Sequence, residues 1–188
     1  MKTIGVLALQ GDFEAHRKAL EQAAGANPVK VIEVRTAAQL DICDGLILPG
    51  GESTTMLKLL DEEKLFDPVL RFGGRRSIYG TCAGAILLAR EVSHPAQASL
   101  GLMDIAVERN AYGRQVDSHI ARLRYEDREM EAVFIRAPVI RRAGPEVRVV
   151  ATHRGDPVWV EQGQHMVTTF HPELAADRSV HRRFLEKV

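Results

Sequence analysis

The sequence predicts an α/β fold with a mainly parallel central sheet, to which antiparallel strands are added in the second half of the chain. Three observations lead to this prediction. Short apolar runs alternate with helical segments over about the first ninety residues, which is typical of parallel strands joined by right-handed crossovers. The second half contains β-rich segments separated by short turns, which favours antiparallel pairing. The chain has 188 residues and no repeat or linker, so we expect one domain over 1–188.

The first half supplies the predicted parallel strands and their helices. Asp12 is placed to cap the first helix, and Ser53 or Thr54 to cap the third, whose Met56, Leu57 and Leu60 form an apolar stripe. Buried strands are predicted at 3–9, 29–34, Gly45–Leu48 and 77–80, and helices at 12–24, 36–40, from 53 or 54 onward, and at 83–90.

The second half supplies the predicted antiparallel additions to the sheet. These strands lie at 131–136, 147–152, 158–161 and 166–170, and a final helix is expected at 179–188.

Composition excludes several classes of function. Lys and Arg number 25, as do Asp and Glu, and this balance argues against a nucleic-acid surface, which needs a basic excess. No apolar run is long enough to cross a membrane, and the first residues do not have the pattern of a secretory signal. Two cysteines do not make a disulfide framework. We therefore expect a cytoplasmic protein.

The segment YGTCAGAILLA places Cys82 between a predicted strand and a predicted helix. A residue at such an elbow has a strained backbone, and small residues two positions away on either side relieve the crowding. Gly80 and Gly84 occupy these positions. The elbow would hold the sulfur at a helix N-terminus, where the thiolate is favoured. We interpret Cys82 as a nucleophile, although free cysteines often merely pack in a core, as we expect of Cys43.

A nucleophilic thiol needs a base, and His171 is the best candidate among seven histidines. It follows a predicted strand in FHPEL, and Pro172 biases it toward extended geometry. Residues two apart in an extended chain point the same way, so Glu173 is placed to orient the imidazole. A surface turn is the alternative. The other histidines are poorer candidates because they lie in an amphipathic helix (His16), among polar residues (His94, His181) or without an obvious helper (His119, His153, His165).

The segment PGGEST follows the third predicted strand and suggests an anion-binding turn. A backbone N–H at Gly50 or Gly51, together with that of Ala83, would bind the oxyanion of a tetrahedral intermediate. The alternative is a plain glycine turn. A phosphate loop is disfavoured because no Gly-Lys-Ser/Thr follows.

Charged residues close to these motifs would bind an amino-acid substrate. Glu52 would hold an ammonium group, and Arg109 or Arg136 a carboxylate. Solvated surface positions are the alternative. No Cys/His spacing typical of a metal site is present.

These residues resemble the class I glutamine amidotransferases, whose triad is Cys-His-Glu. More narrowly, the chain is similar to the family of glutaminase subunits of pyridoxal 5′-phosphate synthases. The motifs follow the family order through nearly the whole chain: LALQGD at 7–12, PGGEST at 49–54, GTCAG at 80–84, RNAYGRQVDS at 109–118, FIRAP at 134–138 and TFHPEL at 169–174.

The resemblance implies a three-layer α/β/α fold and hydrolysis of L-glutamine to glutamate and ammonia without a cofactor or metal. It implies that Cys82 is the nucleophile and that His171 and Glu173 complete the triad. It also implies a glutamine site lined by Gly50, Gly51, Glu52, Arg109, Ile135 and Arg136.

The resemblance further implies a partner, a (β/α)8-barrel synthase subunit that joins the ammonia to a pentose phosphate and a triose phosphate. In the family, glutaminases dock on the outside of a synthase dodecamer, and docking switches on hydrolysis. Gln10 resembles a family position near both the interface and the oxyanion hole, so we expect it to couple docking to hydrolysis. Neither nucleic acid nor a membrane is expected as a partner.

Three other functions fit parts of the sequence. A stand-alone cysteine hydrolase of the same fold, such as a peptidase or a γ-glutamyl hydrolase, would act on larger substrates without a partner. A non-enzymatic redox sensor would use Cys82 but would need neither the His171 segment nor PGGEST. A binding subunit without catalysis is disfavoured by the intact triad.

Overall fold

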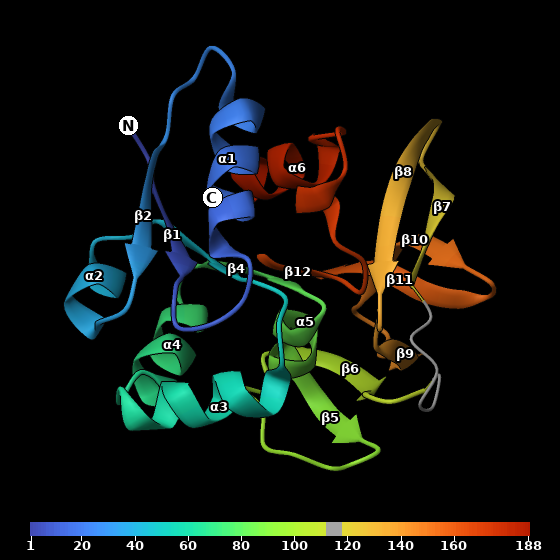
Figure 1. Ribbon diagram of the computed structural model, residues 1–188, viewed down its shortest axis with the longest axis horizontal. Helices are drawn as coiled ribbons and strands as arrows, with labels where there is room; N and C mark the ends of the chain where they lie inside the picture. Colours follow the sequence, from blue (N-terminus) through green and yellow to red (C-terminus); the bar gives the residue numbers. More distant parts are fainter. Residues whose placement is uncertain (112–117) are drawn as a thin grey trace.

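Seven strands form the central sheet in a computed structural model, which describes residues 1–111 and 118–188 (Figure 1). Their order is β10-β11-β12-β4-β3-β1-β2. The strands in chain order are β1 (Thr3–Leu7), β2 (Lys30–Val34), β3 (Gly45–Leu48), β4 (Ser77–Thr81), β10 (Arg148–His153), β11 (Asp156–Gln162) and β12 (His165–Thr168).

The sheet is parallel from β2 to β12 and antiparallel beyond it. Strands β2, β1, β3, β4 and β12 pair in parallel, whereas β11 and β10 are added in antiparallel pairing. This arrangement confirms the predicted fold class. The order also brings together the carboxyl ends of β12, β4, β3 and β1, where ligands bind in open α/β sheets.

Helices cover both faces of the sheet and make it the middle of three layers. Figure 1 shows α1 and α6 on one face and α3, α4 and α5 on the other. In β3, Leu46 and Leu48 pack with the α3–α5 layer and Ile47 packs with the opposite layer, because successive side chains point to opposite faces. The helices are α1 (Phe13–Ala24), α2 (Ala37–Asp41), α3 (Ser53–Glu62), α4 (Phe66–Gly73), α5 (Ala83–Leu88) and α6 (Ser179–Lys187), with a 3₁₀ turn, η1, at Pro172–Leu174.

Of the two helix caps predicted, one is present and one is displaced. Asp12 caps α1 as predicted, by accepting from the backbone N–H of Ala15, and Thr36, where a short helix was expected to begin, caps α2. The cap of α3 is Glu52, and the prediction of Ser53 or Thr54 was wrong by one or two positions. A glutamate side chain is long enough to turn back onto the first-turn N–H groups, which is the role usually taken by a shorter side chain.

The chain contains more strands and helices than predicted. The helix expected at 83–90 ends at Leu88, and the chain continues as β5 (Ala89–Ser93). This strand pairs with β6 (Met103–Glu108), which pairs with β9 (Val139–Ala143), in a separate sheet of three strands. Together with α4, these three strands were not predicted.

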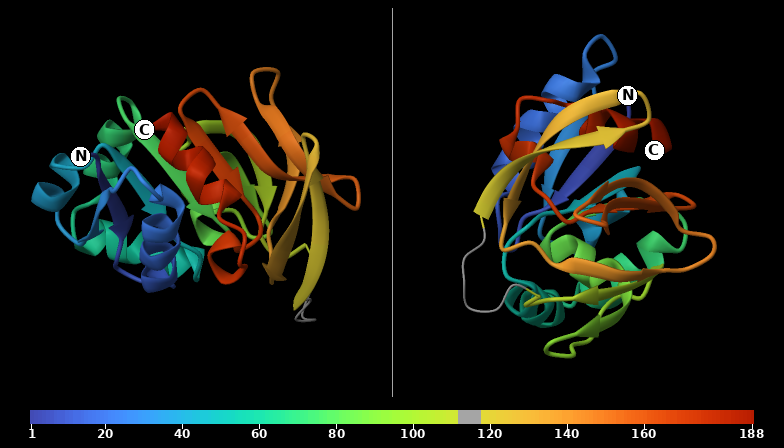
Figure 2. Two further views of the ribbon diagram at one scale, coloured as in Figure 1. Left: turned by 90° about the horizontal axis from the view of Figure 1, so that it is seen from above. Right: turned by 90° about the vertical axis from the view of Figure 1, so that its right-hand side faces the viewer.

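The strand predicted at 131–136 does not join the central sheet, and that expectation was wrong. It is β8 (Arg128–Ile135), which forms an antiparallel hairpin with β7 (Ser118–Tyr125), also not predicted. Figures 1 and 2 show the hairpin beyond the β10 end of the central sheet. Met130, Ala132 and Phe134 alternate along β8 and are buried, so the hairpin contributes one apolar face to the core.

Within residues 1–111 and 118–188, no helix combines the length and the apolar character needed to span a membrane.

Candidate active site

Cys82 occupies the sharp turn between β4 and α5. Its backbone has φ 48° and ψ −103°, a conformation that is strained for any residue with a side chain. A Cβ atom on Gly80 would lie 2.5 Å from backbone atoms of Gly84, and one on Gly84 would overlap the carbonyl oxygen of Leu48. The elbow predicted from the sequence is therefore present, and both flanking glycines are required for it.

The elbow fixes the direction of Cys82. Its backbone N–H donates to the carbonyl of Thr168 at the end of β12 over 2.9 Å, so the turn is tied to the neighbouring strand. Ala83 is the first residue of α5, and its N–H therefore has no acceptor within the helix.

His171 and Glu173 form a buried pair next to Cys82. The Nδ1–H of His171 donates to Oε1 of Glu173 over 2.7 Å, as predicted. The geometry that joins them differs from the prediction, because Glu173 lies in η1 and not in extended chain. The 3₁₀ turn brings the Glu173 carboxylate back toward the imidazole ring of His171. Pro172 occupies the first position of the turn, where proline is well suited.

The surroundings of His171 favour its protonated form. Burial alone lowers the pKa of its imidazole, but the side-chain interactions with Cys82 and Glu173 outweigh burial and raise the pKa to about 10. Burial also raises the pKa of Glu173, and His16 and His171 offset it, so this carboxyl group titrates below its usual range. The pair is therefore an imidazolium next to a carboxylate near neutral pH.

This pair predicts a pH dependence of stability. The pKa of His171 is about 10 in the folded chain and roughly 6.5 in the unfolded chain. A raised folded pKa stabilises the protein fully below the unfolded value, and the contribution is lost as pH rises toward 10. We expect His171→Gln to lower the free energy of unfolding by on the order of a few kcal/mol at pH 6 and by much less at pH 10.

Urea unfolding of the wild type and His171→Gln at pH 6, 8 and 10 measures this difference. Packing changes caused by glutamine are independent of pH, so they cancel in the comparison between pH values. A gap that stays constant or widens with pH would contradict the assigned protonation.

The loop that contains Gly50 and Gly51 contacts the side chains of Cys82, His171 and Gln10. A Cβ atom on Gly50 would lie 2.5 Å from Cε1 of His171 and 3.5 Å from Cβ of Cys82, so Gly50 lies against both side chains. Gly51 has φ 149° and is covered by the side chain of Gln10, whose Oε1 accepts from the N–H of Glu52 over 3.1 Å. Gln10 therefore contacts the loop predicted to hold the oxyanion.

Glu52 and Arg109 interact with each other at the rim. The Glu52 carboxylate accepts from the N–H groups of Thr54 (3.0 Å) and Thr55 (2.6 Å) at the start of α3. Arg109 donates to Glu52 over 3.3 Å and to the Thr54 hydroxyl over 2.8 Å. Burial raises the pKa of Glu52, but the hydrogen bonds from Thr55 and Thr54 lower it to about 2. Glu52 thus carries a full negative charge near neutral pH.

A pocket of about 320 Å³ is lined by most of the residues predicted for the site. Gly50, Ala83 and Glu173 are not among its lining residues, and Ser53, Ile86 and Asn110 are lining residues that the sequence did not indicate. The lining consists of Gln10, Gly51, Glu52, Ser53, Cys82, Ile86, Arg109, Asn110, Ile135, Arg136 and His171.

The remaining predicted residues enter the pocket from the end of β8. Arg136 follows Ile135 with φ 43°, a left-handed conformation that ends the strand and turns the chain at the pocket wall. The motif predicted at 109–118 begins at this pocket, but its residues 112–117 lie outside the described part of the chain.

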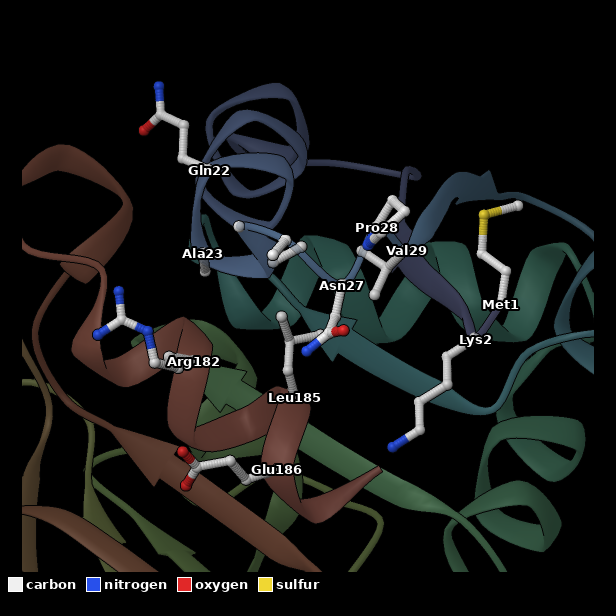
Figure 3. A pocket seen from close by; sticks show the side chains of 13 residues that line it. Met1, Lys2, Gln22, Ala23, Asn27, Pro28, Val29, Arg182, Leu185 and Glu186 are labelled. Atoms are coloured by element: carbon white, nitrogen blue, oxygen red, sulfur yellow. The ribbon is translucent and has the colours of Figure 1, made fainter.

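A larger hollow of about 840 Å³ lies at the other edge of the sheet (Figure 3). It is bordered by Met1 and Lys2, by the end of α1, and by Leu185 and Glu186 of α6. No residue predicted for the active site lines it.

Several side chains outside the pocket have other roles. Cys43 is buried and its thiol donates to the carbonyl of Gln39 over 3.2 Å, so it packs as predicted. Burial raises the pKa of this thiol to about 11. His165 accepts from the N–H of Ile78 over 3.2 Å. Among the described residues, no group of three His, Cys, Asp or Glu side chains is arranged to hold a metal ion.

From the sequence, His16 was a poor candidate for the base because it lies in an amphipathic helix. In the structure it lies next to the pair formed by His171 and Glu173. It is fully buried in α1 and lies 3.5 Å from Glu173. A signal was present, since His16 shares an i, i+3, i+4, i+7 stripe with Ala19, Leu20 and Ala23, and such a stripe marks the buried face of a helix.

The fold and the site define the class of protein. A solved structure described as a glutamine amidotransferase matches with a TM-score of 0.89 and 46% identity over 98% of this chain and 97% of its own. The structure of PurLQS from Thermotoga maritima shares the fold with a TM-score of 0.69 and 17% identity, over 99% and 96% of the two chains.

The family follows from comparison with sequences. Residues 6–188 match the model of the SNO glutamine amidotransferase family, and the chain belongs to this family. Proteins named pyridoxal 5′-phosphate synthase subunit PdxT are similar over nearly their full length. The relative from Solibacter usitatus is 59% identical over 100% of both chains, and that from Deinococcus radiodurans is 53% identical over 97% of this chain and 95% of its own.

Proposed function

We propose that this chain is the glutaminase subunit of a pyridoxal 5′-phosphate synthase, that residues 1–188 form one domain, and that it works in the cytoplasm. Membership of the SNO glutamine amidotransferase family and the PdxT relatives support the reaction and the pathway. One observation carries the residue assignment: His171 interacts with both Cys82 and Glu173 at one pocket. Both thiols are free, which suits a reducing compartment.

In the proposed mechanism, Cys82 is the nucleophile and His171 is the base. The proton of the Cys82 thiol resides on His171, which is the imidazolium described above, and the sulfur attacks the side-chain amide carbon of glutamine. The negative oxygen is bound by the backbone N–H groups of Gly51 and Ala83, and each such donor is worth about 100- to 1,000-fold in rate.

His171 then donates its proton to the leaving ammonia, and a thioester between Cys82 and the substrate remains. A water molecule, deprotonated by the same histidine, cleaves the thioester and releases glutamate. Glu173 holds the imidazole in one tautomer and stabilises its positive charge throughout.

The rim residues bind the amino-acid end of glutamine in this proposal. Glu52 attracts the substrate ammonium, and Arg109 and Arg136 attract the carboxylate. Because Glu52 and Arg109 already pair with each other, glutamine would replace one internal ion pair with two ion pairs to the substrate. Gly50, Gly51 and Ile135 shape the wall next to the side-chain amide.

The proposed partner is a (β/α)8-barrel synthase subunit that accepts the ammonia in a large hetero-oligomer. Gln10 is the proposed coupling residue, because its side chain covers Gly51 and accepts from the N–H next to it. A change in the Gln10 loop on docking would reach the oxyanion site directly.

Ammonia release from free glutamine tests the function. We expect little release by the chain alone and fast release once the barrel subunit is added. Peptides or γ-glutamyl conjugates are offered in parallel. Hydrolysis of those substrates in preference to glutamine, or reversible oxidation of Cys82 with no ammonia release in the complex, would overturn the proposal.

A further inference from the structure

The Glu173 carboxylate has one oxygen without a hydrogen-bond partner. Oε1 receives the proton of His171, but Oε2 is buried and accepts no hydrogen bond from the described residues. An unpaired charged oxygen in a dry interior is costly. His16 compensates, because its Nε2 lies 3.5 Å from Oε2, and neither side chain is exposed to solvent.

His16 also contacts two other elements. Its Nε2 lies 3.2 Å from the hydroxyl oxygen of Thr81, and its Nδ1 lies 3.0 Å from Nε2 of His181 in α6. Thr81 is the last residue of β4 and immediately precedes Cys82. His16 therefore connects the carboxylate at η1 to the strand end that carries the proposed nucleophile.

The partners of the two imidazoles decide where their protons lie. A neutral imidazole has one N–H and one bare nitrogen. Nδ1 of His181 is buried without a partner among the described residues, and a bare nitrogen is less costly there than an unpaired N–H. His181 then donates from Nε2 to Nδ1 of His16, and the His16 proton must be on Nε2, facing Thr81 and Glu173.

Burial keeps both of these histidines neutral. Burial lowers the pKa of His16, where the charge of Glu173 acts in the opposite direction, His171 lowers it further and Asp12 raises it. Burial also lowers the pKa of His181, as do His16 and Arg178. Neutral His16 provides one N–H to the carboxylate without adding a second cation that would compete with His171.

We propose that His16 is a positioning residue of the active site, whose Nε2–H orients Oε2 of Glu173 so that Oε1 stays aligned with Nδ1 of His171. This inference rests on the proposed function. A carboxylate fixed at one oxygen only can rotate about its last bond, and the imidazole would then follow it away from the thiol. With His171 donating to Oε1 and the Nε2–H of His16 facing Oε2 from 3.5 Å, the carboxylate has one favoured orientation.

Three variants of His16 in the complex with the synthase subunit test the proposal. A glutamine side chain places an amide nitrogen near the position of Nε2, whereas asparagine reaches only the position of Nδ1. We expect His16→Asn to lower kcat for ammonia release about 10- to 100-fold with KM for glutamine nearly unchanged. His16→Gln should retain kcat within about threefold of the wild type, since it keeps a donor to Oε2. His16→Met has no donor and provides the same comparison if the asparagine variant does not fold.

The matched control is His165→Met, which removes the buried acceptor of the Ile78 N–H in β12 and lies outside the cluster of His16, Glu173 and His171. It should lose stability but keep kcat. Each rate is divided by the concentration of Cys82 that reacts with iodoacetamide in that preparation, which counts the folded active sites. If His16→Asn and His16→Met keep kcat per active site, or if His16→Gln loses as much as they do, the inference is wrong. A wild-type complex that releases no ammonia would refute the proposed function instead.

The proton positions give a second readout that does not depend on activity. Nitrogen-15 NMR of labelled histidine distinguishes the two neutral tautomers. We expect His16 and His181 both to carry their proton on Nε2 in the complex. A proton on Nδ1 of His16 would turn a bare nitrogen toward Glu173 and overturn the inference.

Discussion

Replacing Cys82 with alanine is expected to abolish ammonia release from glutamine, with a loss of at least about 10⁴-fold in kcat. The sulfur is the atom that forms the proposed thioester, and Ser53, the other hydroxyl or thiol residue in the described pocket lining, donates to Gln97 over 3.1 Å. Ammonia release in the complex with the synthase subunit measures the effect.

The fold should survive this change. Alanine keeps the Cβ atom and the same strained φ of 48°, so the free energy of unfolding should change by no more than about 1 kcal/mol. Cys43→Ala is the matched control, because it removes the other thiol from the core and should leave turnover intact. Turnover by Cys82→Ala close to that of the wild type would refute the assignment of the nucleophile.

Gly84→Ala is expected to lower the free energy of unfolding strongly. The new Cβ atom would overlap the carbonyl oxygen of Leu48 and lie 2.9 Å from its carbonyl carbon. These are backbone atoms of β3, so relief requires moving the strand or α5. We expect a loss of about 3 kcal/mol or more, and a melting temperature lower by about 6–12 °C for a chain of this size.

Gly74→Ala is the control for the same chemical change. Its Cβ atom would meet only the carbonyl oxygen of Arg71 at 3.5 Å, and its φ of −65° is ordinary, so its melting temperature should stay close to that of the wild type. Thermal unfolding followed by circular dichroism compares the two variants. If Gly84→Ala melts with the wild type, the tight contact between the elbow and β3 does not exist.

Sequence patterns predicted the parts of the site that depend on local geometry. The elbow at Cys82 follows from one strand, one helix and two glycines, all within a few residues. The hydrogen bond between His171 and Glu173 also joins residues two apart, although the turn that makes it was not the extended chain expected. The parallel sheet follows from the alternation of strands and helices along the chain. This alternation places the loops that follow β1, β3, β4 and β12 at one edge of the sheet.

Features that depend on distant segments were predicted poorly. The sequence does not show which groups the Glu52 carboxylate interacts with. Folding places it over the first turn of α3 and next to Arg109. The hairpin of β7 and β8 separates from the central sheet because its apolar face is covered by Phe170 and Trp159, which the sequence does not place nearby.

By itself, the sequence determined the alternating strands and helices of the parallel sheet, the sharp turn at Cys82 and the pairing of His171 with Glu173, because each depends on backbone preferences over a few residues. Only the tertiary structure decided that His16 of α1 and His181 of α6 meet behind Glu173. More than a hundred residues separate His16 from both His181 and Glu173. These contacts form because buried polar groups pair with one another once water is excluded.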